Sequence, residues 1–207
     1  MIITLEDPIE FIFKHSSCLI KQREVCGDTR SFSRARRHAL RQDPDVIVVS
    51  ELRDLDTIRI ALTAAETGHL VLATLHTSDA PQTIDRLVDV FPADQQPQII
   101  TQLASCIEGI VCQRLIPRAD GKGRVLASEV LVPGHGIRAC IRDRKLEQIV
   151  GLMEIGFRDG NRTIDQSIEA LLNAGAISRD EAIFHCRERK LFEAPAKETK
   201  KPRSIWA

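Results

Sequence analysis

The sequence is poor in aromatic residues and carries no net charge. Aromatic residues make up 4% of its 207 residues, tyrosine is missing altogether, and 29 basic residues balance 29 acidic ones. Proteins that bind nucleic acid usually need a basic surface, and those that hold single strands stack the bases on aromatic side chains. The composition therefore gives no support to nucleic acid as a partner.

Long apolar runs and a secretory leader are also missing. No run approaches the roughly 20 residues that a membrane-spanning helix needs. The first residues, Met1–Thr4, lack a basic segment followed by an apolar one. The six cysteines include no pair spaced C-x-x-C, which argues against a zinc knuckle. We therefore expect a cytoplasmic protein with reduced thiols.

The rest of the chain is organised around residues 43–54. Four β-branched residues, Val46–Val49, predict a strand buried on both faces, and Ser50 and Glu51 follow it directly. An acidic residue at the carboxyl end of a buried strand is typical of nucleotide-hydrolysing sites in open parallel sheets. A core strand that leads into a solvated turn explains this stretch equally well when it is taken alone.

Two further predicted strands also end in reactive side chains. Helical segments separate the strands, which favours a parallel sheet with right-handed crossovers. Open α/β sheets bind ligands at the edge where the carboxyl ends of parallel strands meet, so we expect the three groups to converge there. They are Glu6 and Asp7 after strand 2–5, Ser50 and Glu51 after strand 46–49, and His76 and Thr77 after strand 70–75.

Apolar positions repeat at helical spacing over most of the remaining chain. Thr163 and Ser178 are good N-cap residues, and Ser178 predicts a capping box with Glu181. Residues 18–25 suggest short strands, for which a hairpin is one option, and residues 193–207 predict a disordered tail. The predicted helices are 31–42, 52–67, 80–91, 93–116 as one helix or two, 137–142, 145–156, 164–174 and 179–190, with one more strand at 124–132.

A phosphate-binding loop is missing from this arrangement. Nucleotide sites of this kind use the sequence G-x-x-x-x-G-K-[ST], whose backbone N–H groups surround the phosphates. Only Gly121 precedes a lysine, and the residue after that lysine is Gly123 rather than serine or threonine. The lysine and the magnesium-binding hydroxyl of such a loop therefore have no substitute in this sequence.

Three segments resemble motifs of the type II/IV secretion ATPases. Residues 3–10 resemble their aspartate box, residues 43–54 their atypical Walker B motif, and residues 68–77 their histidine box. The resemblance extends in order over roughly residues 2–189 and points to the PilT-type ATPases of type IV pilus retraction and twitching motility. The extension and type II secretion branches carry zinc-binding C-x-x-C pairs, which this sequence lacks.

This resemblance implies an α/β fold. The expected architecture is a partial RecA-like P-loop NTPase core, lacking its first strand and phosphate loop, with a C-terminal helical subdomain. We expect the partial core in residues 1–132, the helical subdomain in 133–192 and the tail in 193–207. The family's N-terminal PAS-like domain has no counterpart in the sequence either, so we expect an N-terminally truncated member.

The resemblance also implies roles for individual residues. Glu51 corresponds to the base that orients the attacking water, and His76 to a contact of the γ-phosphate. Glu6 corresponds to an acid near Mg²⁺ and the γ-phosphate, so ATP and Mg²⁺ are the implied ligands. Such charges suit phosphoryl transfer, which depends mainly on positioning and charge stabilisation. Further nucleotide contacts are expected at Asp7, Thr77, Arg23, Arg37 and Arg41.

The sequence departs from the family pattern in two motifs. Ser50 stands where glycine is usual, and Ala139 and Cys140 replace asparagine and leucine in the C-terminal motif at residues 136–141. The Cβ of Ser50 is expected to crowd the nucleotide or the phosphate loop, and the changes at Ala139 and Cys140 weaken the expectation that hydrolysis is coupled to retraction. A metal hydrolase built on His69 and His76 is a further, weaker option.

The family implies a hexameric ring that is peripheral to the cytoplasmic face of the inner membrane and contacts the pilus assembly platform. Two functions remain open at this point. The chain is either the C-terminal part of the ATP-hydrolysing motor, without turnover of its own, or an inactive interaction module or split-gene remnant that keeps the ring contacts.

Overall fold

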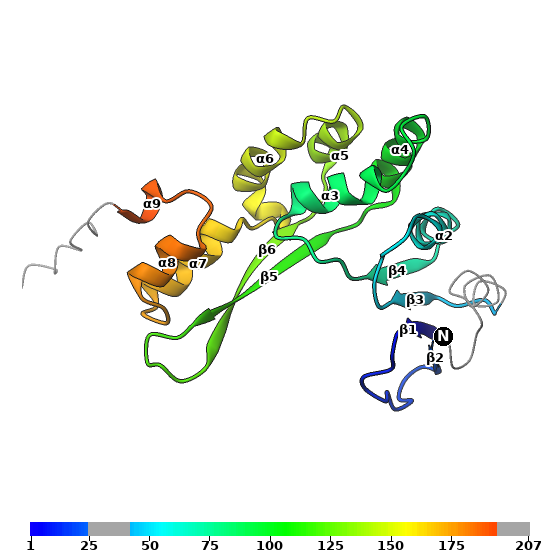
Figure 1. Cartoon of the computed structure of the whole chain (residues 1–207), viewed down its shortest axis with the longest axis horizontal. Helices are drawn as coiled ribbons and strands as arrows, with labels where there is room; N and C mark the ends of the chain where they lie inside the picture. Colours follow the sequence, from blue (N-terminus) through cyan, green and yellow to red (C-terminus); the bar gives the residue numbers. More distant parts are fainter. Residues whose placement is uncertain (25–41, 194–207) are drawn as a thin grey trace, which may run out of the picture.

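The computed structural model describes residues 1–24 and 42–193, which form an elongated molecule (Figure 1). The parallel sheet lies at one end, a long two-stranded hairpin crosses the middle, and the last helices lie at the other end. Arg37 and Arg41, most of the predicted helix 31–42 and nearly all of the predicted tail lie outside the described residues.

The parallel sheet has four strands in the order β2-β1-β3-β4. The register pairs Leu5 of β1 with Val49 of β3, and Val49 with Ala73 of β4. The carboxyl ends of these three strands therefore lie side by side at one edge, as the sequence predicted. The strands are β1 (Ile2–Glu6), β2 (Ile20–Glu24), β3 (Val46–Val49) and β4 (Leu70–Ala73).

Strand β2 corrects the prediction for residues 18–25. Residues 20–24 form one continuous strand rather than two short ones, and it pairs parallel to β1, with Ile2 opposite Ile20 and Glu6 opposite Glu24. Val25, the other end of the predicted hairpin, lies outside the described residues. Residues 7–19 connect β1 to β2, and this length suits a parallel crossover, whereas a hairpin needs only a short turn.

The two faces of the sheet differ in burial. Ile47 and Val49 are buried on one face, whereas Val46 and Val48 on the other are only half-buried. On the outermost strand, β4, Leu70 and Leu72 are 49% and 50% exposed. The prediction that strand 46–49 is buried on both faces is therefore wrong for one face, because Val46 and Val48 pack against neither apolar cluster of the described residues.

Helix α2 (Leu55–Glu66) covers the buried face. It begins after Asp54, whose side chain accepts the N–H of Thr57 at 2.8 Å, and it ends before Gly68, which has φ of 95°. That left-handed backbone favours glycine at the end of a helix. Ile58 and Leu62 join the core with the sheet, which confirms the helix predicted at 52–67.

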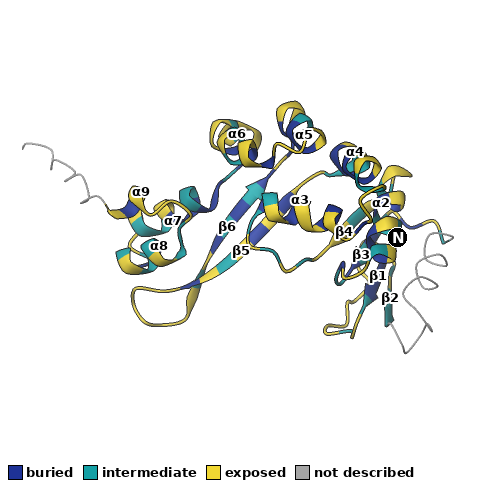
Figure 2. Ribbon diagram, turned by 45° about the horizontal axis from the view of Figure 1, so that its top comes forward, coloured by how far each residue is buried: buried dark blue, intermediate teal, exposed yellow. Residues whose placement is uncertain are grey.

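The predicted helical region 93–116 is only half helical. Helix α4 ends at Cys106, and the chain then forms an antiparallel hairpin. Figure 2 shows burial along the hairpin. On its first strand, buried Cys112 lies between two exposed residues. Short apolar runs do not distinguish strand from helix by themselves. The elements are α3 (Ala80–Asp89), α4 (Gln96–Cys106), β5 (Ile110–Pro117) and β6 (Arg124–Leu131).

The last part of the chain is helical, as predicted. The predicted helix 145–156 is a 3-10 turn followed by α6, and the predicted helix 179–190 stops at His185. The side chain of Asp165 accepts the N–H groups of Arg187 and Glu188, so these amides cannot extend the helix. The elements are α5 (His135–Arg142), η1 (Leu146–Gln148), α6 (Ile149–Ile155), η2 (Gly156–Asp159), α7 (Ile164–Asn173), α8 (Arg179–His185) and α9 (Lys190–Glu193).

Both predicted N-caps are present. Thr163 forms a reciprocal capping box with Gln166. The Ser178 hydroxyl accepts the N–H of Glu181, and the Glu181 carboxylate lies 3.3 Å from His185 Nε2. These caps fix where α7 and α8 begin.

The buried apolar residues form two clusters. The larger one joins the parallel sheet to helices as far along the chain as α6, including Ile141 and Met153. The smaller one joins Ile116 and Ala127 of the hairpin to α7, α8 and α9. The predicted division at residue 132 stays a prediction. Within residues 1–24 and 42–193, no helix combines the length and apolar character that crossing a bilayer requires.

Candidate functional site

The aligned carboxyl ends of β1, β3 and β4 bring three predicted site residues to one edge of the sheet. Glu6 is the last residue of β1, Glu51 follows β3 by two residues, and His76 follows β4 by three. The structure therefore brings together the residues that the sequence placed in three separate motifs. Their nearness follows from parallel strands in register.

The turn that carries Glu51 is tied to both neighbouring strands. The N–H of Ser50 donates to the carbonyl of Leu5 at 2.9 Å, and the N–H of Leu52 donates to the carbonyl of Thr74 at 3.1 Å. The Thr74 hydroxyl in turn donates to the carbonyl of Ser50. Ser50 does not have a positive φ, so the backbone here accommodates serine where the family usually has glycine.

The carboxylate of Glu51 lies between a guanidinium and an imidazole. Its Oε2 accepts from Arg53 Nε at 2.6 Å, and its Oε1 lies 3.4 Å from His76 Nε2. The hydrogen bond from Arg53 is the main cause that lowers the pKa of Glu51. Glu51 is therefore ionised at neutral pH and suits the orientation of a water molecule better than the removal of its proton. Sequence reasoning missed Arg53, although it stands only two positions after Glu51.

Glu6 is held by its own strand and by β2. Its Oε1 accepts from the Thr4 hydroxyl at 2.6 Å and from Gln22 Nε2 at 2.9 Å. Gln22 also donates to the carbonyl of Phe11 at 2.8 Å, which anchors the loop after β1. Sequence reasoning missed this role of Gln22, because the parallel pairing of β2 with β1 was not foreseen.

The other predicted contacts are less closely grouped. Asp7 is exposed just beyond β1, and Arg23 is half-buried on β2. Thr77 shares a hydrogen bond of 2.7 Å with the hydroxyl of Thr83 on α3, so its hydroxyl is already engaged. The two predicted phosphate contacts outside the described residues are Arg37 and Arg41.

A shallow hollow of about 460 Å³ lies beside His76. Burial, followed by the nearby charge of Asp89, raises the pKa of Asp85. The carboxylates of Asp85 and Asp89 both line this hollow. Their negative charge makes it a poor site for a polyphosphate on its own. Its lining consists of His76, Thr77, Gln82, Asp85, Arg86, Asp89 and Val90.

The described residues offer few donors for a metal ion. Among residues 1–24 and 42–193, no three histidine, cysteine or acidic side chains gather as a metal site, so the metal-hydrolase option gains no support there. Mg²⁺ commonly binds through one or two carboxylates, substrate phosphates and water. The carboxylate of Glu6, with both its bonds on Oε1, fits that type of coordination.

Comparison with known sequences identifies relatives of the chain. Residues 1–155 match the model of the type II/IV secretion system protein family. The chain is 48% identical over 181 residues to the type IV pilus retraction ATPase PilT of Pseudomonas aeruginosa, a match that covers 87% of this chain and 52% of that protein. It is 45% identical over 181 residues to a twitching motility protein of Neisseria gonorrhoeae, covering 87% of this chain and 48% of that protein.

Solved structures agree with the sequence comparison. The pilus retraction motor PilT with bound ADP matches with a TM-score of 0.84 and 48% identity, over 92% of this chain and 53% of that one. These matches confirm the predicted RecA-like α/β fold, and the chain spans about half the length of the relatives it matches. The chain belongs to the type II/IV secretion system protein family.

Proposed function

We propose that this chain is the C-terminal part of a hexameric ATP-hydrolysing motor that drives type IV pilus retraction and twitching motility. The observation that supports it best is the alignment of β1, β3 and β4, which gathers Glu6, Glu51 and His76 at one edge. The relatives are a retraction ATPase and a twitching motility protein. The motor would lie in the cytoplasm, peripheral to the inner membrane, and contact the pilus assembly platform.

In this proposal each of the three edge residues has a distinct task. Glu51 accepts a hydrogen bond from the attacking water and orients it, and Arg53 holds the Glu51 carboxylate by a hydrogen bond to Oε2. His76 contacts the γ-phosphate. Glu6 contributes a carboxylate oxygen to Mg²⁺, which when bound offsets the negative charge of the phosphates. Asp7, Thr77, Arg23, Arg37 and Arg41 provide further nucleotide contacts.

The missing phosphate loop limits what the chain does alone. Because the sequence has no G-x-x-x-x-G-K-[ST], its lysine and N–H groups must come from another segment or another chain. In the described sheet β4 is an outer strand without a neighbour on its far side, so an additional strand could pair there. We expect no ATP turnover by the purified chain.

Complementation tests this proposal directly. The chain is purified together with the part of the Pseudomonas relative that precedes the matched region, and phosphate release from ATP is measured. We expect turnover only in the mixture, and Glu51→Gln in this chain should lower kcat about 100-fold or more. Glu154→Gln is the matched control, because Glu154 is exposed on α6. Turnover by the chain alone that requires Glu51 would overturn the proposal.

An inactive interaction module is the second candidate. The missing phosphate loop and the altered motif at residues 136–141 favour it. In that case the chain enters rings with the full-length relative, as seen by co-purification, but Glu51→Gln leaves the ATP turnover of the mixed rings unchanged. A dependence of turnover on Glu51 would exclude this candidate.

A further inference from the structure

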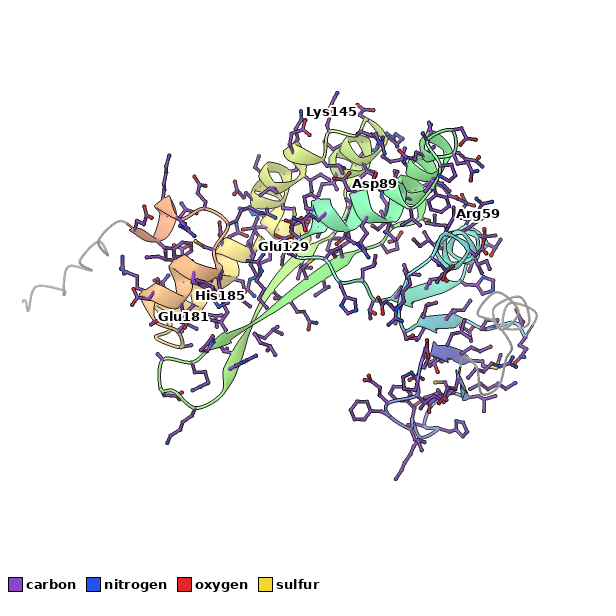
Figure 3. All side chains as sticks on the ribbon, in the orientation of Figure 1. Arg59, Asp89, Glu129, Lys145, Glu181 and His185 are labelled. Carbon is purple, nitrogen blue, oxygen red and sulfur yellow. The ribbon has the colours of Figure 1, made fainter. Side chains whose placement is uncertain are left out.

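The buried carboxylate of Glu129 connects the start of α3 to the far end of the chain (Figure 3). Glu129 lies on β6 and is 1% exposed, and its Oε1 accepts the N–H of Ala80 at 2.8 Å. Its Oε2 has no hydrogen bond within the described part of the chain, and it lies 3.6 Å from the guanidinium of Arg187. A buried carboxylate without a partner is costly, so the position of Arg187 matters.

Arg187 is held at both ends. Its backbone N–H donates to Asp165 of α7 at 2.7 Å. Its guanidinium also pairs with Asp79 at 3.2 Å. Asp79 is the N-cap of α3 and accepts the N–H of Gln82 at 2.9 Å. A single residue therefore joins α7 and the segment after α8, through its backbone and its side chain, to the first turn of α3.

A second arginine joins the same two regions. Arg114 of β5 donates to the carbonyl of His185 at 2.6 Å and to the carbonyl of Ser78 at 3.4 Å. Ser78 follows His76 and Thr77 directly. The loop between β4 and α3 is thus attached to the C-terminal helices at two successive residues, Ser78 and Asp79.

We propose that Arg187 is a positioning residue, which with Glu129 forms a latch that holds the loop of His76 and Thr77 against the C-terminal helices. The functional meaning of the latch rests on the proposed function of the site. Because Glu129 is buried, withdrawal of the Arg187 guanidinium would leave the Glu129 carboxylate without an opposite charge. The contact between these two side chains therefore has two states, closed and broken. A partner that displaces α8 would therefore release His76 and Thr77 together.

Hydrogen exchange followed by mass spectrometry tests the latch on the chain itself, without nucleotide. In Arg187→Gln, the amides of residues 76–83 should exchange at least tenfold faster than in the wild type, while those of β1 and β3 keep their rates. Arg187→Lys, which retains the charge, should restore most of the protection. Arg118→Gln is the matched control, because Arg118 pairs with Asp120 at 2.8 Å in an exposed turn, and it should change nothing in residues 76–83.

A second variant covers the case in which Arg187→Gln is poorly folded. Glu129→Gln keeps an oxygen that accepts the N–H of Ala80 but removes the buried charge. In the Glu129→Gln background, adding Arg187→Gln should therefore speed the exchange of residues 76–83 by less than threefold. Wild-type exchange in Arg187→Gln would overturn the latch, and so would equal acceleration in β1 and β3 or additive effects of the two variants. The exchange experiment contains no ATP. Its result therefore does not depend on whether the complementation experiment succeeds.

Discussion

Replacing Leu70 and Leu72 of β4 by lysine is expected to suppress self-association of the chain. The two side chains are 49% and 50% exposed on the same face of the outermost strand. The outer side of that strand pairs with no other strand in the described sheet. Apolar edges of this kind favour association with another chain.

The size of the effect follows from the area that remains exposed. Complete burial of a leucine side chain contributes about 1.5–3 kcal/mol, so about half of that is still available at each position. The two leucines of one chain then offer about 1.5–3 kcal/mol, and a symmetric pair of chains offers about 3–6 kcal/mol. Their loss weakens the association constant by about two to four orders of magnitude.

Sedimentation velocity over a range of protein concentrations measures this change, and urea unfolding checks that the variant remains folded. Val111→Lys with Leu115→Lys is the matched control, because these side chains are 59% and 58% exposed on the hairpin rather than on the sheet edge. A wild-type chain that stays monomeric, or a control that dissociates the protein as strongly as the β4 variant, would refute the reasoning.

Four further outcomes concern stability and reactivity. Asn161→Ala should lower the free energy of unfolding by about 3 kcal/mol, because the buried amide accepts one backbone N–H and donates to two carbonyls; a loss under about 1 kcal/mol in urea titration would contradict this. Met153→Ala should cost about 2–5 kcal/mol because its side chain is fully buried, whereas exposed Ile155→Ala should stay within about 0.5 kcal/mol. Burial raises the pKa of Cys112 to about 11, so maleimide should label it at least tenfold more slowly at pH 8 than exposed Cys18, as read by peptide mapping. Since the folded chain retains this proton longer than the unfolded one, stability should also fall as the pH rises from about 9 to 11.

The sheet and its edge could be predicted because they depend on local patterns. The β-branched run Val46–Val49 has few structures available other than a strand. Helical spacing between the strands favours parallel pairing, and parallel pairing places all carboxyl ends together. The meeting of Glu6, Glu51 and His76 therefore required only the direction of each strand, not its detailed packing.

The hairpin and the burial of β4 could not be predicted in the same way. Strand β5 begins with an apolar run close to the end of α4, and such a run fits a helix as well as a strand. The alternation between buried and exposed residues depends on the pairing of β5 with β6. The exposure of Leu70 and Leu72 depends on what covers their face of the sheet, and no feature of residues 70–73 encodes that.

The polar network around Glu129 shows a different limit of sequence reasoning. In the sequence, Glu129 and Arg187 look like ordinary charged surface residues on separate elements. They meet only because the hairpin carries Glu129 between α3 and the C-terminal helices. Contacts between single charges far apart in sequence have no periodic signal, so a pattern search cannot find them.

The side chains of the altered motif at residues 136–141 have different roles in the structure. Arg138 donates to the carbonyls of Ala104 and Ser105 at 2.9 and 3.0 Å, which caps the end of α4. Cys140, which replaces the family leucine, is still buried in the core. Ala139, which replaces asparagine, is half-buried and has lost its polar group. Arg138 and Cys140 therefore keep structural contacts, and we expect any weakening of the coupling that the family resemblance implies to come from Ala139.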